Sequence, residues 1–76
     1  MKELIKYIAK SLVDDPLQVR VDEIVKGDLT TIELRVAPED MGQVIGREGR
    51  MANAMRALLH VSAARQGEQA RLKILE

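Results

Sequence analysis

The chain has 76 residues with 12 basic and 12 acidic side chains, and it contains no cysteine. A chain of this length forms one domain that buries only about 60% of its unfolded surface, and without cysteine neither a disulfide nor a thiolate metal site can stabilise it. No apolar run approaches the roughly 20 residues of a membrane span, and the charged N-terminus has no signal-peptide core. We therefore expect a soluble, cytoplasmic protein without membrane insertion.

The first part of the sequence predicts a helix and a hairpin. Apolar residues recur at helical spacing from the fourth position onward: Leu4, Ile5, Ile8, Leu12 and Val13. Pro16 ends this helix because proline cannot continue it. Alternating side chains predict a strand from residue 17, and the alternation slips at residues 23–25, as a β-bulge would make it do. Gly27-Asp28 then predicts a tight turn, and alternation over residues 31–36 predicts the second strand.

A short helix is predicted after this hairpin. Pro38 suits the first position of a helix, and Glu39 and Asp40 place negative charge in its first turn, where the helix dipole favours it. The helix is expected to run to Ile45. Gly46 would then be its C-terminal residue in a left-handed conformation.

The last part of the sequence predicts a longer helix and a strand. The helix is expected over residues 50–66, with a core stripe of Met51, Met55, Leu58 and Leu59. Gly67 ends it, and alternation predicts a strand over residues 71–74. The order αββααβ indicates a single α+β domain over residues 1–76, with helices packed on one face of a three-stranded mixed sheet.

Gly46 and Gly49 interrupt helical sequence twice, with two residues between them. Gly46 can adopt positive φ without steric cost, and Gly49 leaves no side chain at the start of the following helix. Free backbone N–H groups and the positive end of the helix dipole meet there, and both attract phosphate. Arg47, Arg50 and Arg56 would add charge-assisted contacts. The same turn would also serve as a purely structural corner between two helices.

The segment VIGREGRMANAMR resembles the IGxxGxxI signature of K-homology (KH) domains, which bind single-stranded RNA or DNA. The chain length and the stretch PEDMGQVIGREGR are similar to those of the small bacterial KhpA family. The resemblance implies a type II KH domain. Its β-αα-β core would span about residues 30–76, and the additional helix and strand would precede it at about residues 2–27.

The resemblance also implies where RNA would bind. In KH domains the loop matching Gly46–Gly49 clamps the backbone of about four nucleotides, and the bases lie in an apolar groove beside it. RNA-binding residues are accordingly expected at Val44, Ile45, Gly46, Arg47, Glu48, Gly49, Arg50, Asn53 and Arg56. The groove is expected to be walled by Ile32, Leu34, Val36, Met51 and Ala54.

Two features depart from common RNA-binding patterns. The loop centre often contains a basic residue in KH domains, whereas Glu48 would repel a phosphate that it faced, so we expect it to point to solvent. The only aromatic residue is Tyr7, and bases therefore cannot stack on rings as they do in RRM domains. An aliphatic KH groove needs no aromatic residue.

The resemblance further implies partners. Members of the KhpA family form homodimers and pair with a larger KH protein, KhpB, in RNA regulation or chaperoning and in the growth and shape of the bacterial cell. The Ala-rich long helix is a candidate dimer surface because small residues permit close approach. The alternative is a protein–protein adaptor with a KH fold and little RNA affinity, which the neutral net charge and Glu48 favour.

No catalytic or cofactor site is indicated. His60 has no nearby ligand or proton-transfer partner in the sequence, so we expect it on the solvent face of the long helix. The acidic pairs are expected at helix ends and strand edges, since adjacent carboxylates rarely hold a cation alone. A Walker-type loop requires Gly-Lys-Ser/Thr, whereas Arg50 and Met51 follow Gly49. We expect neither enzymatic activity nor a bound cofactor or metal.

Overall fold

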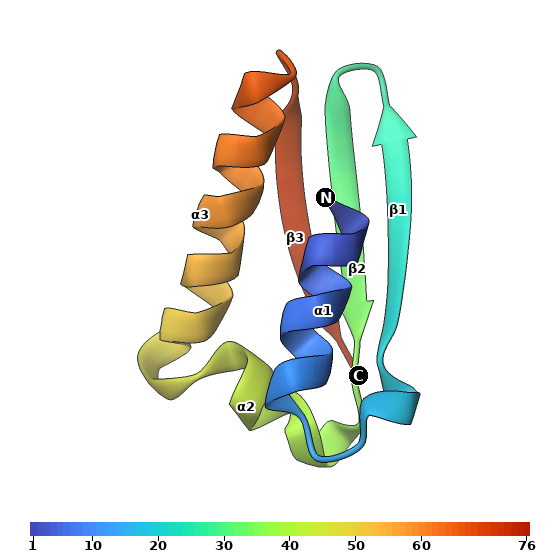
Figure 1. The fold of residues 1–76 in the computed structure, drawn as a ribbon, viewed down its shortest axis with the longest axis vertical. Coiled ribbons are helices and arrows are strands. Elements are labelled where there is room, and N and C mark those ends of the chain that lie inside the picture. The colour runs from blue at the N-terminus through green and yellow to red at the C-terminus, as the bar shows by residue number, and fades with distance from the viewer.

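The computed structural model describes residues 1–76 as three α-helices and a three-stranded sheet (Figure 1). In chain order the elements are α1 (Lys2–Leu12), β1 (Arg20–Lys26), β2 (Leu29–Arg35), α2 (Met41–Ile45), α3 (Arg50–Arg65) and β3 (Gln69–Leu75). Short 3₁₀ turns precede β1, α2 and α3 at Pro16–Gln18, Pro38–Asp40 and Arg47–Gly49. This order confirms the predicted αββααβ arrangement. None of the helices combines the length and the apolar character that crossing a membrane requires.

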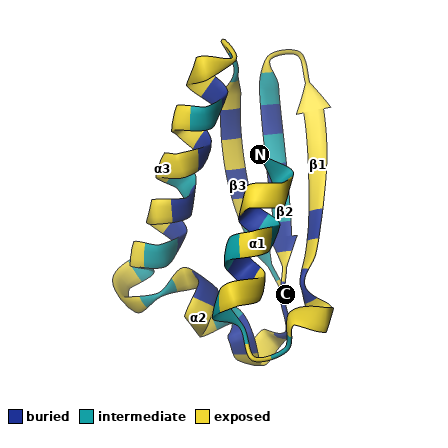
Figure 2. Ribbon diagram, viewed as in Figure 1, coloured by how far each residue is buried: buried dark blue, intermediate teal, exposed yellow.

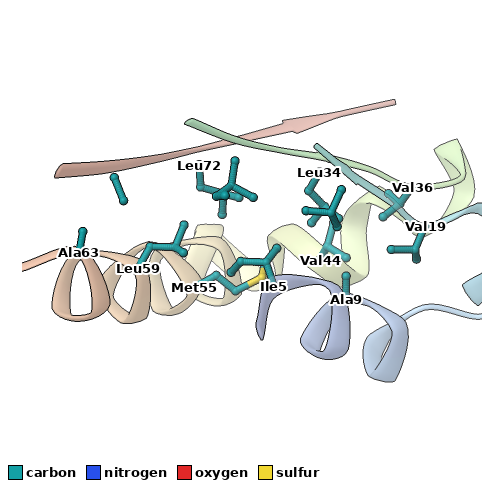
Figure 3. Packing of buried hydrophobic residues seen from close by; sticks show 13 residues of the cluster. Ile5, Ala9, Val19, Leu34, Val36, Val44, Met55, Leu59, Ala63 and Leu72 are labelled. Atoms are coloured by element: carbon teal, nitrogen blue, oxygen red, sulfur yellow. The ribbon is translucent and has the colours of Figure 1, made fainter. Parts of the chain in front are cut away.

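The sheet is mixed, with the strand order β1-β2-β3. β1 and β2 are antiparallel and are joined by the predicted two-residue turn, in which Gly27 has φ 60°. A glycine with positive φ at the first turn position matches the right-handed twist of the flanking strands. β2 and β3 are parallel, and α2 and α3 form the connection between them. All three helices therefore lie on one face of the sheet (Figure 3).

The core lies between this face and the helices. β2 contributes alternate side chains that are fully or almost fully buried, as the predicted alternation requires (Figure 2). The cluster comprises 13 residues: Ile5, Ala9, Val19, Val21, Ile32, Leu34, Val36, Val44, Met55, Leu59, Ala63, Ala70 and Leu72. Burying each of the larger aliphatic side chains contributes about 1.5–3 kcal/mol. These contacts, rather than disulfides, hold the short chain together.

The first strand begins later than the sequence predicts. Leu17 lies in a 3₁₀ turn and is 94% exposed, because Pro16 starts that turn and places the next residues outside the sheet. The β-bulge is also wrong, since β1 and β2 pair without interruption from Arg20↔Arg35 to Lys26↔Leu29. The break in the alternation instead reflects the position of β1 at the edge of the sheet. Val25 lies on the helix side of this strand but stays exposed.

The core stripe of α3 also differs from the prediction at one position. Leu58 is 46% exposed, whereas Ala52 and Ala63 are buried. The buried face repeats through positions 52, 55, 59 and 63, and its alanines allow the helix to approach the sheet closely. Gly67, with φ 70°, ends the helix in a Schellman motif, in which the N–H of Glu68 donates to the carbonyl of Ala63 at 2.8 Å,.

Candidate nucleic-acid interface

The turn between α2 and α3 requires glycine at Gly46 for two reasons. Its backbone has φ 78° and ψ 172°, a region that is essentially restricted to glycine. The positive φ confirms the prediction, although ψ lies outside the left-handed helical region. A Cβ at this position would lie 2.8 Å from the Cβ of Met51 and 2.9 Å from its backbone nitrogen. The first turn of α3 therefore packs directly against Gly46.

The next three residues complete the turn and leave backbone donors free. Glu48 has φ 58° and ψ 25°, and Gly49 has φ 76° and ψ 12°, so both are left-handed. Outside the regular elements, the N–H of Gly49 donates to Gly46 at 3.1 Å, whereas neither Arg47 nor Glu48 donates a backbone hydrogen bond. No side chain caps the start of α3. The turn therefore presents backbone donors at the positive end of a 16-residue helix,.

The charged side chains of the turn point outward. Glu48 lies 3.9 Å from the guanidinium of Arg50, and the two side chains are 74% and 80% exposed. An ion pair this exposed is weak, so it leaves Arg50 able to exchange its partner. Arg47 is exposed and forms no ion pair. The expected solvent-facing orientation of Glu48 agrees with this geometry.

Two further predicted contact residues continue from the turn along one side of α3. A Cβ on Gly49 would lie 3.9 Å from the amide nitrogen of Asn53, and Arg56 donates to the Oδ1 of Asn53 at 3.3 Å. These positions follow helical spacing, so their side chains share a face. The structure thus brings the backbone donors of the turn and the polar residues Asn53 and Arg56 together at one end of α3.

The predicted apolar groove is only partly available. The side chains of Ile32, Leu34 and Val36 are 0%, 0% and 4% exposed, so assigning them to a groove wall is wrong. They lie on the central strand, whose inner face the helices cover. Val44 is also fully buried, so its side chain is in the core. The apolar side chains accessible near the turn are those of Ile45 and Ala54, with Met51 half-buried.

A hollow that the sequence did not reveal lies between α3 and β3. Its volume is about 320 Å³, and it is lined by His60, Ala63, Glu68, Gln69 and Ala70. His60 is exposed, as predicted, yet it follows Asn53 and Arg56 at helical spacing and extends the same polar side of α3,. That spacing is the one sequence signal that links His60 to the turn.

Asp40 plays a part that the sequence did not indicate. The residue is 3% exposed, and its two carboxylate oxygens accept the backbone N–H groups of Asp14 and Asp15 at 3.2 and 3.1 Å. Asp40 therefore ties the chain leaving α1 to the start of α2 (Figure 1). The opposite end of α2 leads into the turn, so this carboxylate helps to fix the segment that presents the backbone donors.

The sequence pattern of the family described as "KhpA/KhpB, KH domain" matches residues 2–74. The chain belongs to this family. Relatives named RNA-binding protein KhpA from Caldanaerobacter subterraneus subsp. tengcongensis and Clostridium perfringens are 48% and 44% identical over 75 residues, which cover 99% of this chain and 100% of each relative. The protein of that name from Halalkalibacterium halodurans is 46% identical over the full length of both chains. No solved structure matches the chain significantly.

Membership of the KhpA/KhpB family confirms the resemblance drawn from the GxxG segment. The extra helix and strand, α1 and β1, precede the β2-α2-α3-β3 unit, which is the type II order expected of this KH domain. Because the match spans nearly the whole chain, it includes the turn, the polar side of α3 and the Asp40 tie.

Proposed function

We propose that this KhpA/KhpB-family domain binds single-stranded RNA and holds the sugar-phosphate backbone on the turn Gly46–Gly49. The supporting observation is the uncapped start of α3, where backbone donors without acceptors lie beside the exposed residues Arg47 and Arg50. Phosphate oxygens accept from such N–H groups, and the helix dipole and the guanidinium groups favour the negative charge. The printed name of the relatives, RNA-binding protein, supports RNA as the ligand.

The bases would lie along the side of α3 that begins at the turn. Ile45 and Ala54 offer aliphatic contacts, and Asn53, Arg56 and His60 offer polar ones. Without aromatic rings for stacking, base discrimination rests on these few groups and is modest. A single site of this kind should bind in the micromolar range, which corresponds to about −8 kcal/mol.

The test of this function is a titration of fluorescently labelled single-stranded RNA. The parent should bind saturably, with an affinity that falls with salt at a log–log slope of about −0.7 per contacted phosphate. The double variant Arg47→Asp with Glu48→Asp should bind at least about tenfold more weakly, because the phosphate loses the Arg47 guanidinium and meets a carboxylate in its place. Equal affinity of the double variant and the parent would remove the turn as the binding site.

A matched control separates the turn from general charge. Lys10→Asp changes the net charge by the same amount, but its side chain lies exposed on α1. This variant should retain the parent affinity to within about twofold, because the charge lies outside the turn and α3, on an exposed side chain that salt screens. Circular dichroism of each variant should match the parent spectrum.

Pairing with a second KH domain would raise the affinity of this weak site. α3 exposes an apolar stripe at positions 57, 58 and 61, in which Leu58 is 46% and Val61 58% exposed. We infer that this stripe joins two copies, or one copy and a KhpB-like KH protein, because linked sites gain avidity. Such a pair would act on RNA as a post-transcriptional regulator or chaperone.

Light scattering over a range of concentrations tests this pairing. The parent should have the mass of a dimer, and Val61→Glu should be monomeric, because a buried unpaired charge opposes association. Leu17→Ser is the control, since it removes an exposed apolar side chain far from α3 and should leave the dimer intact. A parent that is monomeric at all concentrations would overturn the dimer and leave RNA binding untouched.

The alternative function is that of a protein–protein adaptor. The zero net charge and the Glu48–Arg50 pair favour it, because both reduce attraction for RNA. The same titration decides between the two functions: a folded parent without saturable RNA binding at low salt would support the adaptor.

A further inference from the structure

The outer face of the sheet is open and carries more basic than acidic side chains. The helices cover only the face onto which Leu34 and Leu72 point (Figure 3), and Val21 of β1 is buried on the same face. Strand alternation places these residues on the opposite face: Arg20, Asp22, Ile24, Lys26, Leu29, Thr31, Glu33, Arg35, Gln69, Arg71, Lys73 and Leu75. Five of them are basic and two are acidic. The chain as a whole has no net charge, so acidic residues outnumber basic ones on the rest of the molecule.

A shallow hollow lies within this outer face. Its volume is about 230 Å³, and its lining includes the three cations Lys26, Arg71 and Lys73, with Ile24 and Thr31 between them. The register pairs Thr31 with Arg71 and Glu33 with Lys73. None of these cations forms an ion pair, because the only pair within 4.0 Å in the molecule is Glu48–Arg50. Unpaired cations around a hollow create a field that attracts a polyanion.

We propose that this outer face is a second RNA-contact surface, which takes phosphates of a strand longer than the turn can hold. The inference rests on the RNA binding proposed above. β3 is an edge strand and packs under α3, the helix that starts at the turn. A strand leaving the turn can therefore pass around the β3 edge to reach Arg71 and Lys73. The molecule is only 16 Å across its shortest axis.

The chemistry of the face favours RNA over an acidic protein. Protein interfaces centre on buried aromatic or aliphatic anchors, whereas Ile24, at 41% exposed, is the only exposed large apolar side chain on this face, and no aromatic residue is present. Binding to RNA phosphates, by contrast, requires only basic side chains, which replace the counterions of the phosphates.

RNA length provides the test. A stacked strand rises about 3.4 Å per nucleotide, so 20 nucleotides exceed the 35 Å long axis of the protein, whereas a pentamer occupies the turn alone. The variant Arg71→Gln with Lys73→Gln should bind the pentamer as the parent does. It should bind the 20-mer about five- to tenfold more weakly, with a salt slope smaller by about 1.4 for two lost phosphate contacts. Lys6→Gln with Lys10→Gln on α1 is the charge-matched control and should change neither affinity.

Each possible result either supports the outer face as an RNA-contact surface or contradicts it. Parent-like affinity and salt slope of the Arg71/Lys73 variant for the 20-mer would overturn the proposal. If the parent binds the 20-mer but no pentamer, and the Arg47/Glu48 variant has no effect, the turn fails as a site while the outer face stands. A labelled 20-residue polyglutamate serves as the acidic-protein probe. If it binds the parent but not the Arg71/Lys73 variant, while the variant binds the 20-mer RNA as the parent does, the face binds an acidic protein and the RNA proposal is overturned. Absence of binding to both RNAs would overturn both sites.

Discussion

Replacing Gly46 with valine should lower the free energy of unfolding by about 3 kcal/mol or more. The backbone at φ 78° and ψ 172° costs a non-glycine residue about 1–3 kcal/mol,, and a β-branched side chain tolerates positive φ least. The new Cβ would also lie 2.8 Å from the Cβ of Met51, and forcing extra atoms into a packed site costs about 1–3 kcal/mol. Urea denaturation followed by circular dichroism measures the change. RNA affinity should fall with it, because the turn cannot close.

Substitutions at two other glycines separate backbone strain from steric crowding in the expected effect of Gly46→Val. Gly27 also has positive φ, at 60°, but no atom lies within 4 Å of its added Cβ, so Gly27→Ala reports backbone strain alone. Gly42 lies within α2 without positive φ and also faces open space, so Gly42→Ala should stabilise the helix by about 0.5–1 kcal/mol. We expect the destabilisation to rank Gly46→Val first and Gly27→Ala second. A Gly46→Val protein as stable as the parent would contradict the described turn.

Replacing Asp40 with alanine should lower the free energy of unfolding by about 2–4 kcal/mol. The substitution leaves the N–H groups of Asp14 and Asp15 without the carboxylate that accepts them at 3.2 and 3.1 Å. Hydrogen bonds to a charged group contribute about 1.5–3 kcal/mol each, and a donor left unsatisfied costs about 1–3 kcal/mol if it stays buried. Both donors are only partly buried, so water recovers part of the loss and the estimate stays below the sum.

The neighbouring residue is the control for Asp40. Glu39 precedes it in the same 3₁₀ turn but is exposed, so Glu39→Ala should change stability by no more than about 0.5 kcal/mol. Asp40→Asn should fall between the two, because the amide keeps one acceptor and turns a donor toward the other N–H. Equal urea midpoints for Asp40→Ala and Glu39→Ala would show that the two hydrogen bonds contribute nothing.

Local chemistry made most of the fold predictable from sequence. Gly27 and Gly67 act on their own backbone, and each bounds an element where predicted. The predictions failed where packing against distant parts of the chain decides whether a residue is buried. Val25 lies on the helix side of the edge strand but stays exposed, and Leu58 lies one position from a face on which alanines pack closely. Periodicity reports which residues share a face, not how far the opposing layer extends.

The same division holds for the candidate site. The turn was predictable because Gly46 and Gly49 determine its geometry within a few residues. The groove wall was not, because alternation shows that one side of β2 is covered without showing whether helices or a ligand cover it; Ile32 and Leu34 lie beneath helices. The bonds of Asp40 reach residues 25 and 26 positions earlier, and no local pattern encodes such a partner.

The parallel pairing of β2 with β3 determines when the turn can become rigid during folding. The β1–β2 hairpin closes within one short segment, whereas Leu29 must find Gln69, on the far side of both α2 and α3. Closing a long loop is entropically costly and slow compared with a hairpin. The segment that holds the turn lies inside this loop, so it is fixed only when the last strand docks. A fluctuation that detaches β3 from the sheet would consequently release the turn as well, and the two should exchange their amide hydrogens as one cooperative unit.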